Sequence, residues 1–342
     1  MTDAVGLRTL AATVPATLVE RVRAARRVLV VSHENPDADT LGAGLAVRTI
    51  VSHLGSQATA VCTDPPPALY EFIPGIETVR TDPDPGGSYD LVVLVDCAAT
   101  DRVGAVRDRH PRIFRDLPLV TIDHHVSNDA MSDADWIDPQ AAATCEMVAL
   151  LAARLGVPLD TADGALATAL MAGIVMDTAT FAHPNATART LQVSAALVEA
   201  GAPLSDISRR LYRTKPEAQL RLFGRALERL EASSDHRVIW TTLSEADHRA
   251  TGTQPAHSEG IIDLLAQAED AEVAIVFKEA GPGSTRLSVR TRPGGVDATV
   301  LTGRFGGGGH ARAAGATLDR PLEEAIDIVV AEARRLADEV RR

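Results

Sequence analysis

Continuous apolar runs of strand length set the pattern of the first half of the chain. They occupy residues 28–31, 91–95 and 119–122. Segments with helical patterning flank and separate them, at residues 18–26, 39–54, 144–155, 161–176, 188–199 and 207–212. Continuous apolar strands alternating with helices are typical of a parallel sheet covered on both faces. We therefore predict an α/β domain with a parallel sheet and helices on both faces.

The pattern changes after residue 212. Lys215 and Pro216 indicate a hinge, and the remaining elements are expected at 217–231 (helix), 238–242 (strand), 260–268 (helix), 273–277 and 285–291 (strands) and 322–340 (helix). A chain of 342 residues favours more than one domain. The prediction is a catalytic domain at 1–212, a linker at 213–218 and a smaller C-terminal α/β domain at 219–342, with an active-site cleft between the domains.

Composition limits the classes of function. The net charge of −12 argues against a protein that binds duplex or long single-stranded nucleic acid, which needs a broad basic surface, but it permits a small phosphorylated ligand. The three cysteines lack metal-site or disulfide spacing and suit a reducing compartment. We expect no signal peptide, because the first residues lack a cationic start. The longest apolar run, 165–176, falls short of the ~20 residues of a membrane span. We expect a cytoplasmic protein without membrane association.

Polar residues follow each of the three predicted strands. His33, Asp96 and Asp123 stand at these strand ends. Parallel sheets bind ligands at the carboxyl ends of their strands, so the three side chains are expected in one site. Each aspartate also has a purely structural interpretation. Asp96 could bond to the amides of a turn, and Asp123 could be a polar residue of a loop.

Further acidic and imidazole groups accompany these residues. Asp37 and Asp39 begin a predicted helix after Pro36, where an aspartate often serves only as a cap. His124 and His125 follow Asp123. Asp177 ends an apolar segment, where it could also simply terminate a buried helix without a functional role.

These oxygen and nitrogen donors, without thiolates, suit Mn²⁺ or Mg²⁺. Two such ions sharing a carboxylate would activate water for displacement at phosphorus, so no serine or cysteine nucleophile is required.

These motifs resemble those of the DHH phosphoesterase superfamily. The first motif is matched by His33, Asn35, Pro36, Asp37 and Asp39, the second by Asp96, and the third by Asp123, His124, His125 and Asn128. Asp177 and Thr178 resemble the fourth, although Met176 and Ala179 stand where Thr and Gly are frequent. The glycines at 306–309 with His310, followed by residues 313–315, resemble the DHH-associated C-terminal domain.

The resemblance implies roles for these residues. His33, Asp37 and Asp96 would hold one Mn²⁺, and Asp39, Asp96, His124 and Asp177 the other, with Mg²⁺ or Co²⁺ as possible substitutes. Asp96, His125 and Asp123 would be the catalytic group, with His125 facing the scissile phosphate and Asp123 orienting a histidine. Substrate binding would fall to Asn128, Arg290, Gly307, Gly308, Gly309 and His310. The glycine run alone is equally consistent with a flexible hairpin, and the resemblance also suggests a homodimer.

The layout is similar to the short-oligoribonuclease group of the superfamily. That similarity implies substrates of a few ribonucleotides and adenine nucleotides such as 3′-phosphoadenosine-5′-phosphate. Three alternatives stay open. They are a cyclic di-AMP phosphodiesterase with the same metals, a family II pyrophosphatase, whose C-terminal lysine-rich signature is missing here, and a nucleotide-binding regulator with a dead site, which the intact ligand set disfavours.

Overall fold

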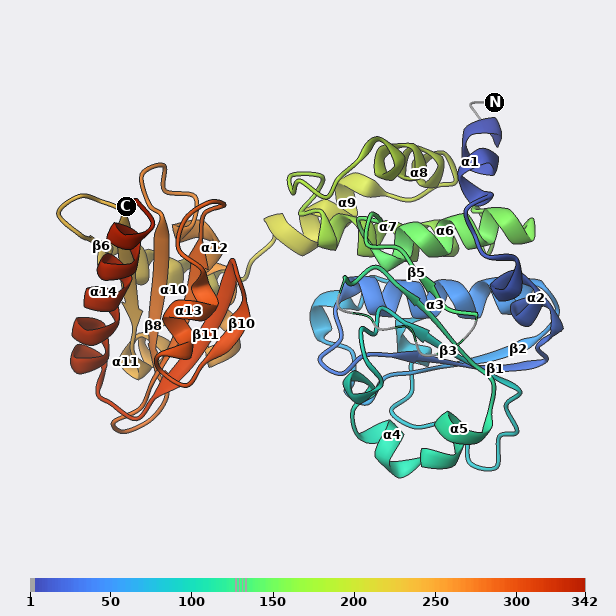
Figure 1. Ribbon diagram of the computed structural model, residues 1–342, viewed down its shortest axis with the longest axis horizontal. Helices are drawn as coiled ribbons and strands as arrows, with labels where there is room; N and C mark the ends of the chain where they lie inside the picture. Colours follow the sequence, from blue (N-terminus) through green and yellow to red (C-terminus); the bar gives the residue numbers. More distant parts are fainter. Residues whose placement is uncertain (1–3, 127, 129, 131, 133, 342) are drawn as a thin grey trace. The chain divides into compact units, whose positions relative to one another are not determined.

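The protein is described by a computed structural model that covers the chain apart from residues 1–3, 127, 129, 131, 133 and 342. The chain divides into two compact units, Met1–Thr214 and Lys215–Arg342 (Figure 1). Each unit is described by itself, and the cleft expected between them stays a prediction. No helix in the described part of the chain is long and apolar enough to span a bilayer.

The N-terminal unit contains the predicted parallel sheet, with five strands. Their order is β2 (Gln57–Val61), β1 (Arg27–Ser32), β3 (Leu91–Val95), β4 (Leu119–Asp123) and β5 (Trp136–Ile137), and all neighbouring pairs are parallel. The central three strands are almost entirely buried, which explains their continuous apolar runs. The two edge strands were not predicted, because β2 mixes exposed and buried residues and β5 has only two residues.

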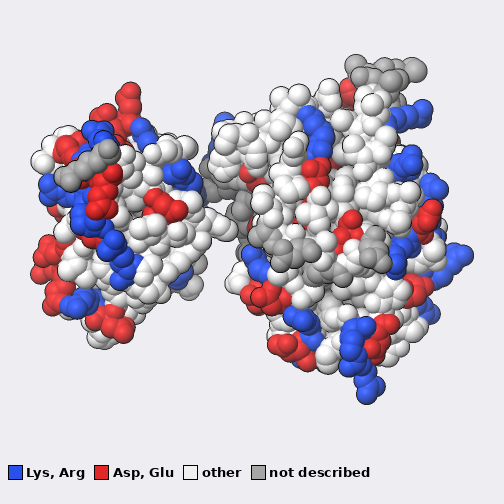
Figure 2. All heavy atoms as spheres, viewed as in Figure 1, with Lys and Arg blue, Asp and Glu red and all other residues white. Residues whose placement is uncertain are grey.

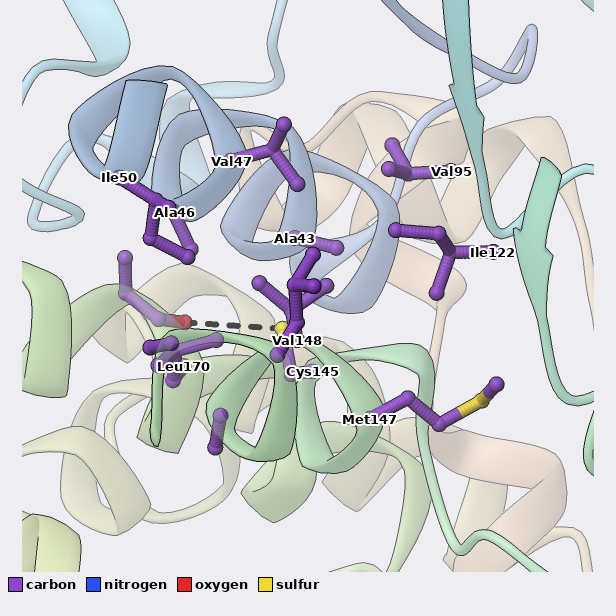
Figure 3. Packing of buried hydrophobic residues seen from close by; sticks show 14 of the residues in the cluster. Ala43, Ala46, Val47, Ile50, Val95, Ile122, Cys145, Met147, Val148 and Leu170 are labelled. Atoms are coloured by element: carbon purple, nitrogen blue, oxygen red, sulfur yellow. Dashed lines mark hydrogen bonds between the residues drawn. The ribbon is translucent and has the colours of Figure 1, made fainter. Parts of the chain in front are cut away.

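Helices cover both faces of this sheet, as predicted. On one face α3 (Ala38–His53), α6 (Thr144–Leu155) and α7 (Ala165–Asp177) enclose the main core, and Ala43, Ala46 and Val47 of α3 face Val148 of α6 and Leu170 of α7 (Figure 3). On the other face Val103 and the short helices α4 (Ala105–Arg109) and α5 (Pro111–Asp116), which were not predicted, cover β1 and β3. The unit is completed by α1 (Ala4–Ala11), α2 (Ala16–Ala24), α8 (Ala188–Glu199), α9 (Leu204–Ser208), the π-helical turn Arg209–Arg213 and three 3-10 turns, Ala68–Tyr70, Ile76–Thr78 and Thr100–Val103.

One helix boundary in this unit differs from its prediction for a clear reason. The helix expected from residue 161 begins at Ala165, since Ala162, Asp163 and Gly164 have φ values of 58°, 55° and 81°. These left-handed conformations cannot continue into a right-handed helix. The helix predicted at 207–212 is confirmed, although it begins earlier, at Leu204, and continues from α9 into the π-helical turn.

The C-terminal unit is a mixed six-stranded sheet with helices on both faces. The strand order is β10 (Gly308–His310), β11 (Ala313–Leu318), β9 (Thr285–Thr291), β8 (Val273–Glu279), β7 (Val238–Leu243) and β6 (Glu231–Ala232). Only the β7–β8 pair is parallel. One core contains α13 (Ala298–Gly303) and α14 (Leu322–Glu339), and the other contains α10 (Glu217–Glu228) and α12 (Ile261–Leu265). The helix α11 (Glu245–Thr251) and the 3-10 turn Pro255–Ser258 complete the unit.

The expected glycine turn at 306–310 is largely a strand. Residues Gly308–His310 form β10, which pairs antiparallel with β11. A Cβ on Gly307 would lie 2.2 Å from the carbonyl oxygen of Gly315, and one on Gly309 would lie 2.6 Å from that of Ala313. Two of the glycines are therefore required by close packing against β11.

The two signs of charge are mixed over the face drawn in Figure 2. On the face drawn in Figure 2, Lys and Arg side chains alternate with Asp and Glu side chains over both units. Many of the basic groups are paired with acidic neighbours, such as Arg237 with Asp235 and Arg335 with Glu332. The absence of long nucleic-acid binding stays a prediction.

Candidate metal centre at the carboxyl edge of the parallel sheet

The ends of three adjacent strands carry the polar groups predicted from the sequence. His33 directly follows β1, Asp96 directly follows β3, and Asp123 is the last residue of β4. Because β1, β3 and β4 are neighbours, all three residues lie at one edge of the sheet. Asp37 and Asp39 reach the same place from the start of α3, and Asp177 reaches it from the end of α7.

Asp96 lies at the centre of this cluster. One carboxylate oxygen, Oδ2, is 3.5 Å from Nε2 of His33, and the other, Oδ1, is 3.5 Å from Nε2 of His124 and 3.6 Å from Nδ1 of His125. The residue is buried and has a φ of 56°, an uncommon backbone conformation outside glycine that occurs often at functional sites. Burial by itself would raise the pKa of Asp96, but the hydrogen bond to His33 and the charges of the neighbouring imidazoles hold that pKa below its usual range.

Asp37 and His33 form one side of the cluster. Asp37 is the N-cap of α3 and accepts hydrogen bonds from the backbone amides of Asp39 and Thr40, so the capping alternative is realised. Its Oδ1 is still 4.0 Å from Nε2 of His33. The other ring nitrogen of His33, Nδ1, lies 2.6 Å from the carbonyl oxygen of Glu34. That contact leaves Nε2 of His33 as the ligand atom facing Asp37 and Asp96.

Asp39, His124 and Asp177 form the other side. Asp39 is completely buried, and Nε2 of His124 lies 3.3 Å from Oδ2 of Asp177. Nδ1 of His124 lies 3.3 Å from the carbonyl oxygen of Ala141, which again directs Nε2 toward the carboxylates. Asn185 supports this side by donating to the carbonyl oxygens of Ala142 and Asp177.

The electrostatics of the cluster indicate a shortage of positive charge. Burial, followed by the negative charge of Asp96, raises the pKa of Asp37 and raises the pKa of Asp39 to about 7. Burial and the charges of Asp39 and Asp96 raise the pKa of Asp177 well above its usual value. Carboxylates crowded in a buried place repel one another in their ionised forms, and a bound cation relieves that repulsion.

The donor atoms are close enough to hold metal ions. Three sets of residues each bring their ligand atoms within 4.8 Å of one another. They are Asp96 with His124 and His125, His33 with Asp37 and Asp96, and Asp39 with His124 and Asp177. Asp96 and His124 each belong to two sets. Carboxylate oxygen and imidazole nitrogen are suitable donors for Mn²⁺, Mg²⁺ and related divalent ions. The residues present therefore fit a divalent-metal centre.

Asp123 lies behind this centre and bonds to two neighbours. Its Oδ1 accepts a hydrogen bond of 2.7 Å from Nδ1 of His125, and its Oδ2 accepts one of 2.7 Å from the side-chain amide of Asn128. The bond to Asp123 is the main cause that raises the pKa of His125. The amide of Asn128 also donates to the carbonyl oxygen of Cys97, and its oxygen accepts from the amide of Ala130. Asn128 thus links Asp123 to Cys97 and Ala130, and its role in binding substrate stays a prediction.

Sequence reasoning missed the contribution of the start of α6. The backbone amides of Thr144 and Cys145 donate to the two oxygens of Asp39, at 2.6 and 2.9 Å, and the hydroxyl of Thr144 donates to Oδ1 of Asp96 at 3.0 Å. A threonine at the start of a predicted helix was the available signal. It carried no information about which carboxylates the helix would meet, because Asp39 is 105 residues earlier.

The substrate-binding residues predicted in the C-terminal unit lie on one part of its sheet. Arg290 of β9 and His310 of β10 are both paired with Ala313 of the intervening strand β11. Paired residues on adjacent antiparallel strands project from the same face, so the two side chains share a face, about 10 Å apart at two strand spacings. His310 is exposed, and Nε of Arg290 donates to Asp263 at 2.9 Å.

Small residues occupy the adjacent cross-strand row on that face. Ser288, Gly315 and Gly308 are paired across β9, β11 and β10. A Cβ on Gly308 would meet open space. The sheet surface beside Arg290 and His310 therefore carries no bulky side chain at these three positions.

Known proteins resemble the chain over most of its length. The bifunctional oligoribonuclease and PAP phosphatase NrnA of Thermus thermophilus is 31% identical over 317 residues, which cover 90% of each protein. The protein of the same description from Bacillus subtilis is 24% identical and covers 85% of this chain and 89% of its own length. The cyclic-di-AMP phosphodiesterase GdpP of Geobacillus thermodenitrificans is a more distant relative, 26% identical over 93% of this chain but only 47% of its own.

The fold and the two domains are also matched. The crystal structure of an exopolyphosphatase-related protein from Bacteroides fragilis has the same fold, with a TM-score of 0.85 at 20% identity over 96% of this chain and 99% of that one. Residues 27–174 match the DHH family, N-terminal domain, and residues 237–339 match the DHHA1 domain. With both domains in this order and a 31% identical relative along 90% of both proteins, the chain belongs to the DHH family.

Proposed function

We propose that the chain is a Mn²⁺-dependent phosphoesterase that hydrolyses short oligoribonucleotides, including pApA, to nucleoside 5′-monophosphates, and 3′-phosphoadenosine-5′-phosphate to AMP and phosphate. The observation that carries the proposal is the convergence of three carboxylates and three imidazoles around the carboxylate of Asp96. Its support comes from relatives with names that specify oligoribonuclease and PAP phosphatase activity.

The ligand assignment follows the sets of donors. His33, Asp37 and Asp96, which form one set, would hold one Mn²⁺. The set of Asp39, His124 and Asp177 would hold the other together with Asp96, whose Oδ1 lies 3.5 Å from Nε2 of His124, so that Asp96 is shared. Bound divalent ions would supply a nucleophilic hydroxide near neutral pH and stabilise charge at phosphorus. His125, held by Asp123 through Nδ1, would direct Nε2 toward the phosphate. Its raised pKa favours the protonated ring, which can donate to a phosphate oxygen or to the leaving group.

The C-terminal unit is proposed to bind the base and the terminal phosphate. Arg290 and His310 supply donors for a phosphate on one face of the sheet, and the row of Ser288, Gly315 and Gly308 offers a low surface on which a base can rest. Gly307 and Gly309, required by packing against β11, would shape this surface. If Arg290→Ala and His310→Ala leave the KM for dinucleotides unchanged, this part of the proposal is wrong.

The decisive experiment is product analysis with purified protein and Mn²⁺. The panel contains oligoribonucleotides of two to five residues, 3′-phosphoadenosine-5′-phosphate, pApA, cyclic di-AMP and pyrophosphate, and chelator-treated protein is the control. The proposal expects turnover of the short linear RNAs and of the adenosine bisphosphate, and loss of both on removal of the metal. Turnover restricted to pyrophosphate, or none at all, contradicts it.

A cyclic di-AMP phosphodiesterase is the second candidate, since the similarity to GdpP spans 93% of this chain. That similarity covers less than half of GdpP, which makes it the weaker of the two. A higher kcat/KM for cyclic di-AMP than for pApA favours the second candidate. The cytoplasmic location and the homodimer expected from the sequence stay predictions.

A further inference from the structure

The first turn of α6 meets two buried carboxylates of the metal centre. Its amides at Thr144 and Cys145 each donate to one oxygen of Asp39, and the hydroxyl of Thr144 donates to Asp96. Thr144, Asp39 and Asp96 are all almost completely buried. The contacts therefore form in a place with little water, where hydrogen bonds to charged groups are strong and specific in direction.

This arrangement differs from ordinary helix capping. The N-cap of α6 is Ala143, whose side chain cannot accept a hydrogen bond. Asp39 from α3 instead accepts from the first two amides of the helix, those of Thr144 and Cys145, which have no partner within the helix. The side chain of Thr144 does not cap its own helix and is free to bond to Asp96. The positive end of the helix dipole and one hydroxyl thus act on carboxylates from two other elements.

A glycine of α7 also packs closely against Asp39. A Cβ added to Gly173 of α7 would lie 2.4 Å from Oδ1 of Asp39 and 2.4 Å from the sulfur of Cys145. Asp39 is therefore held between the amides of α6 and the backbone of α7, with little freedom to rotate. The oxygen lone pairs not used by the amides are the ones available to a cation.

Thr144 contacts only one of the two carboxylate oxygens of Asp96. Its hydroxyl bonds to Oδ1, the oxygen that faces Nε2 of His124, whereas Oδ2 faces Nε2 of His33. An effect transmitted through this hydroxyl should reach the ligand set that contains His124 and Asp39 more strongly than the set that contains His33.

We infer that Thr144 is a positioning residue, whose hydroxyl and amide fix Asp96 and Asp39 so that the ligand set containing His124 binds its divalent ion tightly. This inference rests on the proposed function only in requiring that the cluster bind a divalent cation. It goes beyond that function in assigning a role to the start of α6.

The test measures Mn²⁺ affinity rather than activity alone. Thr144→Val removes the hydroxyl and keeps the shape and the backbone amide, and Thr144→Ser keeps the hydroxyl. Loss of a partner that orients a metal ligand weakens binding by about 10- to 100-fold, which is the expected increase in Kd of one of the Mn²⁺ sites for Thr144→Val. Thr144→Ser should retain the wild-type affinity. Titrations followed by electron paramagnetic resonance of Mn²⁺ and by calorimetry give both sites.

The control is another buried threonine of the same unit. Thr121 of β4 is completely buried, and its hydroxyl makes no hydrogen bond to any described residue. Thr121→Val is the same chemical change, and it should leave both Mn²⁺ affinities unchanged. The melting temperatures of the metal-free variants separate a general loss of stability from a loss of metal binding. If Thr144→Val does not fold, Thr144→Ala serves in its place.

A second comparison locates the effect. In a His124→Ala background, which removes a ligand of the affected set, Thr144→Val should cause no further loss of Mn²⁺ affinity, whereas in a His33→Ala background the loss should persist. A wild-type chain that binds Mn²⁺ with an affinity unchanged in Thr144→Val overturns the inference and leaves the proposed function standing. A wild-type chain that binds no divalent cation overturns both.

Discussion

Nδ1 of His125 lies 2.7 Å from Oδ1 of Asp123, a carboxylate that is completely buried while the imidazole is partly exposed. The aspartate therefore fixes the orientation of the ring from within the protein, and Nε2 is the nitrogen left for a ligand. This one contact separates the three residues of the sequence motif into a support, Asp123, an imidazole oriented by it, His125, and an imidazole directed at the carboxylates, His124.

The first prediction concerns the pH dependence of activity. The hydrogen bond to Asp123 raises the pKa of His125, so Asp123→Asn should lower it. If the protonated ring donates to the phosphate or to the leaving group, the alkaline limb of the kcat profile moves to lower pH in the variant. The control is Asp82→Asn, since Asp82 pairs with His110 at 3.0 Å on the surface. A profile unchanged by Asp123→Asn contradicts the role given to His125.

The second prediction concerns the shared carboxylate. Asp96→Asn keeps the shape of the side chain but removes the negative charge of a carboxylate whose two oxygens face His33 and His124. If Asp96 bridges two metal ions as proposed, its charge contributes to both sites, and turnover of pApA should fall by at least about 100-fold in the variant. Asp101→Asn, at an exposed position in the 3-10 turn Thr100–Val103, should retain activity. Wild-type activity in Asp96→Asn would exclude the two-metal scheme.

The sequence was most informative where a pattern is local. Residues 28–31, 91–95 and 119–122 are buried on both faces of the sheet, so their apolar runs identified β1, β3 and β4, and the strand ends located His33, Asp96 and Asp123. β2 was missed because Gln57, Thr59 and Ala58 are exposed or half-buried at a sheet edge, which leaves no apolar run to detect.

Contacts between distant segments left no comparable signal. The amides of α6 satisfy Asp39 across 105 residues, and an Ala-Ala-Ala-Thr sequence gives no sign of that partner. Gly308–His310 was expected as a turn because glycine is rare in strands, yet the close approach of β11 requires glycine at 307 and 309. In both cases the tertiary packing, rather than the local propensity, decides the structure.

The third prediction tests the close packing at Asp39. Gly173→Ala places a methyl group against Oδ1 of Asp39 and the sulfur of Cys145, so the variant should lose about 1–3 kcal/mol of unfolding free energy. It should also bind Mn²⁺ more weakly than the wild type. The matched control is Gly224→Ala in α10, where a Cβ meets open space and alanine should stabilise the helix by about 0.5–1 kcal/mol. Equal effects of the two substitutions on stability would contradict the close packing of Gly173 against Asp39.

The fourth prediction concerns the turn after Asp177. Ala179, Thr180 and Phe181 have φ values of 46°, 58° and 64°, three successive left-handed residues beside the metal centre. A left-handed conformation costs a residue with a Cβ roughly 1–2 kcal/mol, and glycine avoids this cost. Part of the gain is lost because glycine has more conformational freedom in the unfolded state. Ala179→Gly should therefore raise the unfolding free energy by about 0.5–1 kcal/mol.

The control for this change is an alanine in an ordinary helix. Ala195 is exposed in the interior of α8, where replacement by glycine should destabilise by about 1 kcal/mol. Chemical denaturation of both variants gives the two signs directly. Destabilisation of similar size in both would show that Ala179 is not strained.

The fifth prediction concerns acid stability of the C-terminal unit. The buried carboxylate of Asp247 accepts hydrogen bonds from Arg229 at 2.5 and 2.8 Å, from Arg225 at 2.7 Å and from the amide and hydroxyl of Ser244 at 2.9 and 2.8 Å. The bonds to Arg229 are the largest of the contributions that hold the pKa of Asp247 far below its usual value. A carboxyl with a lower pKa in the folded state stabilises the fold above its unfolded pKa of about 3.9, and this contribution is lost as the pH falls below that value.

Asp247→Asn should remove this contribution, lowering the unfolding free energy by about 2–3 kcal/mol at pH 7 and by progressively less as the pH falls below about 4. The two tryptophans lie in different units, Trp136 in β5 and Trp240 in β7, so urea unfolding of a Trp136→Phe chain reports on the C-terminal unit alone. Glu245→Gln, at an exposed position in the same helix α11, should change the free energy by less than about 0.5 kcal/mol. If Asp247→Asn loses the same free energy of unfolding at pH 7 and at pH 3, the charge of Asp247 is not the source of the stability, and the prediction is wrong.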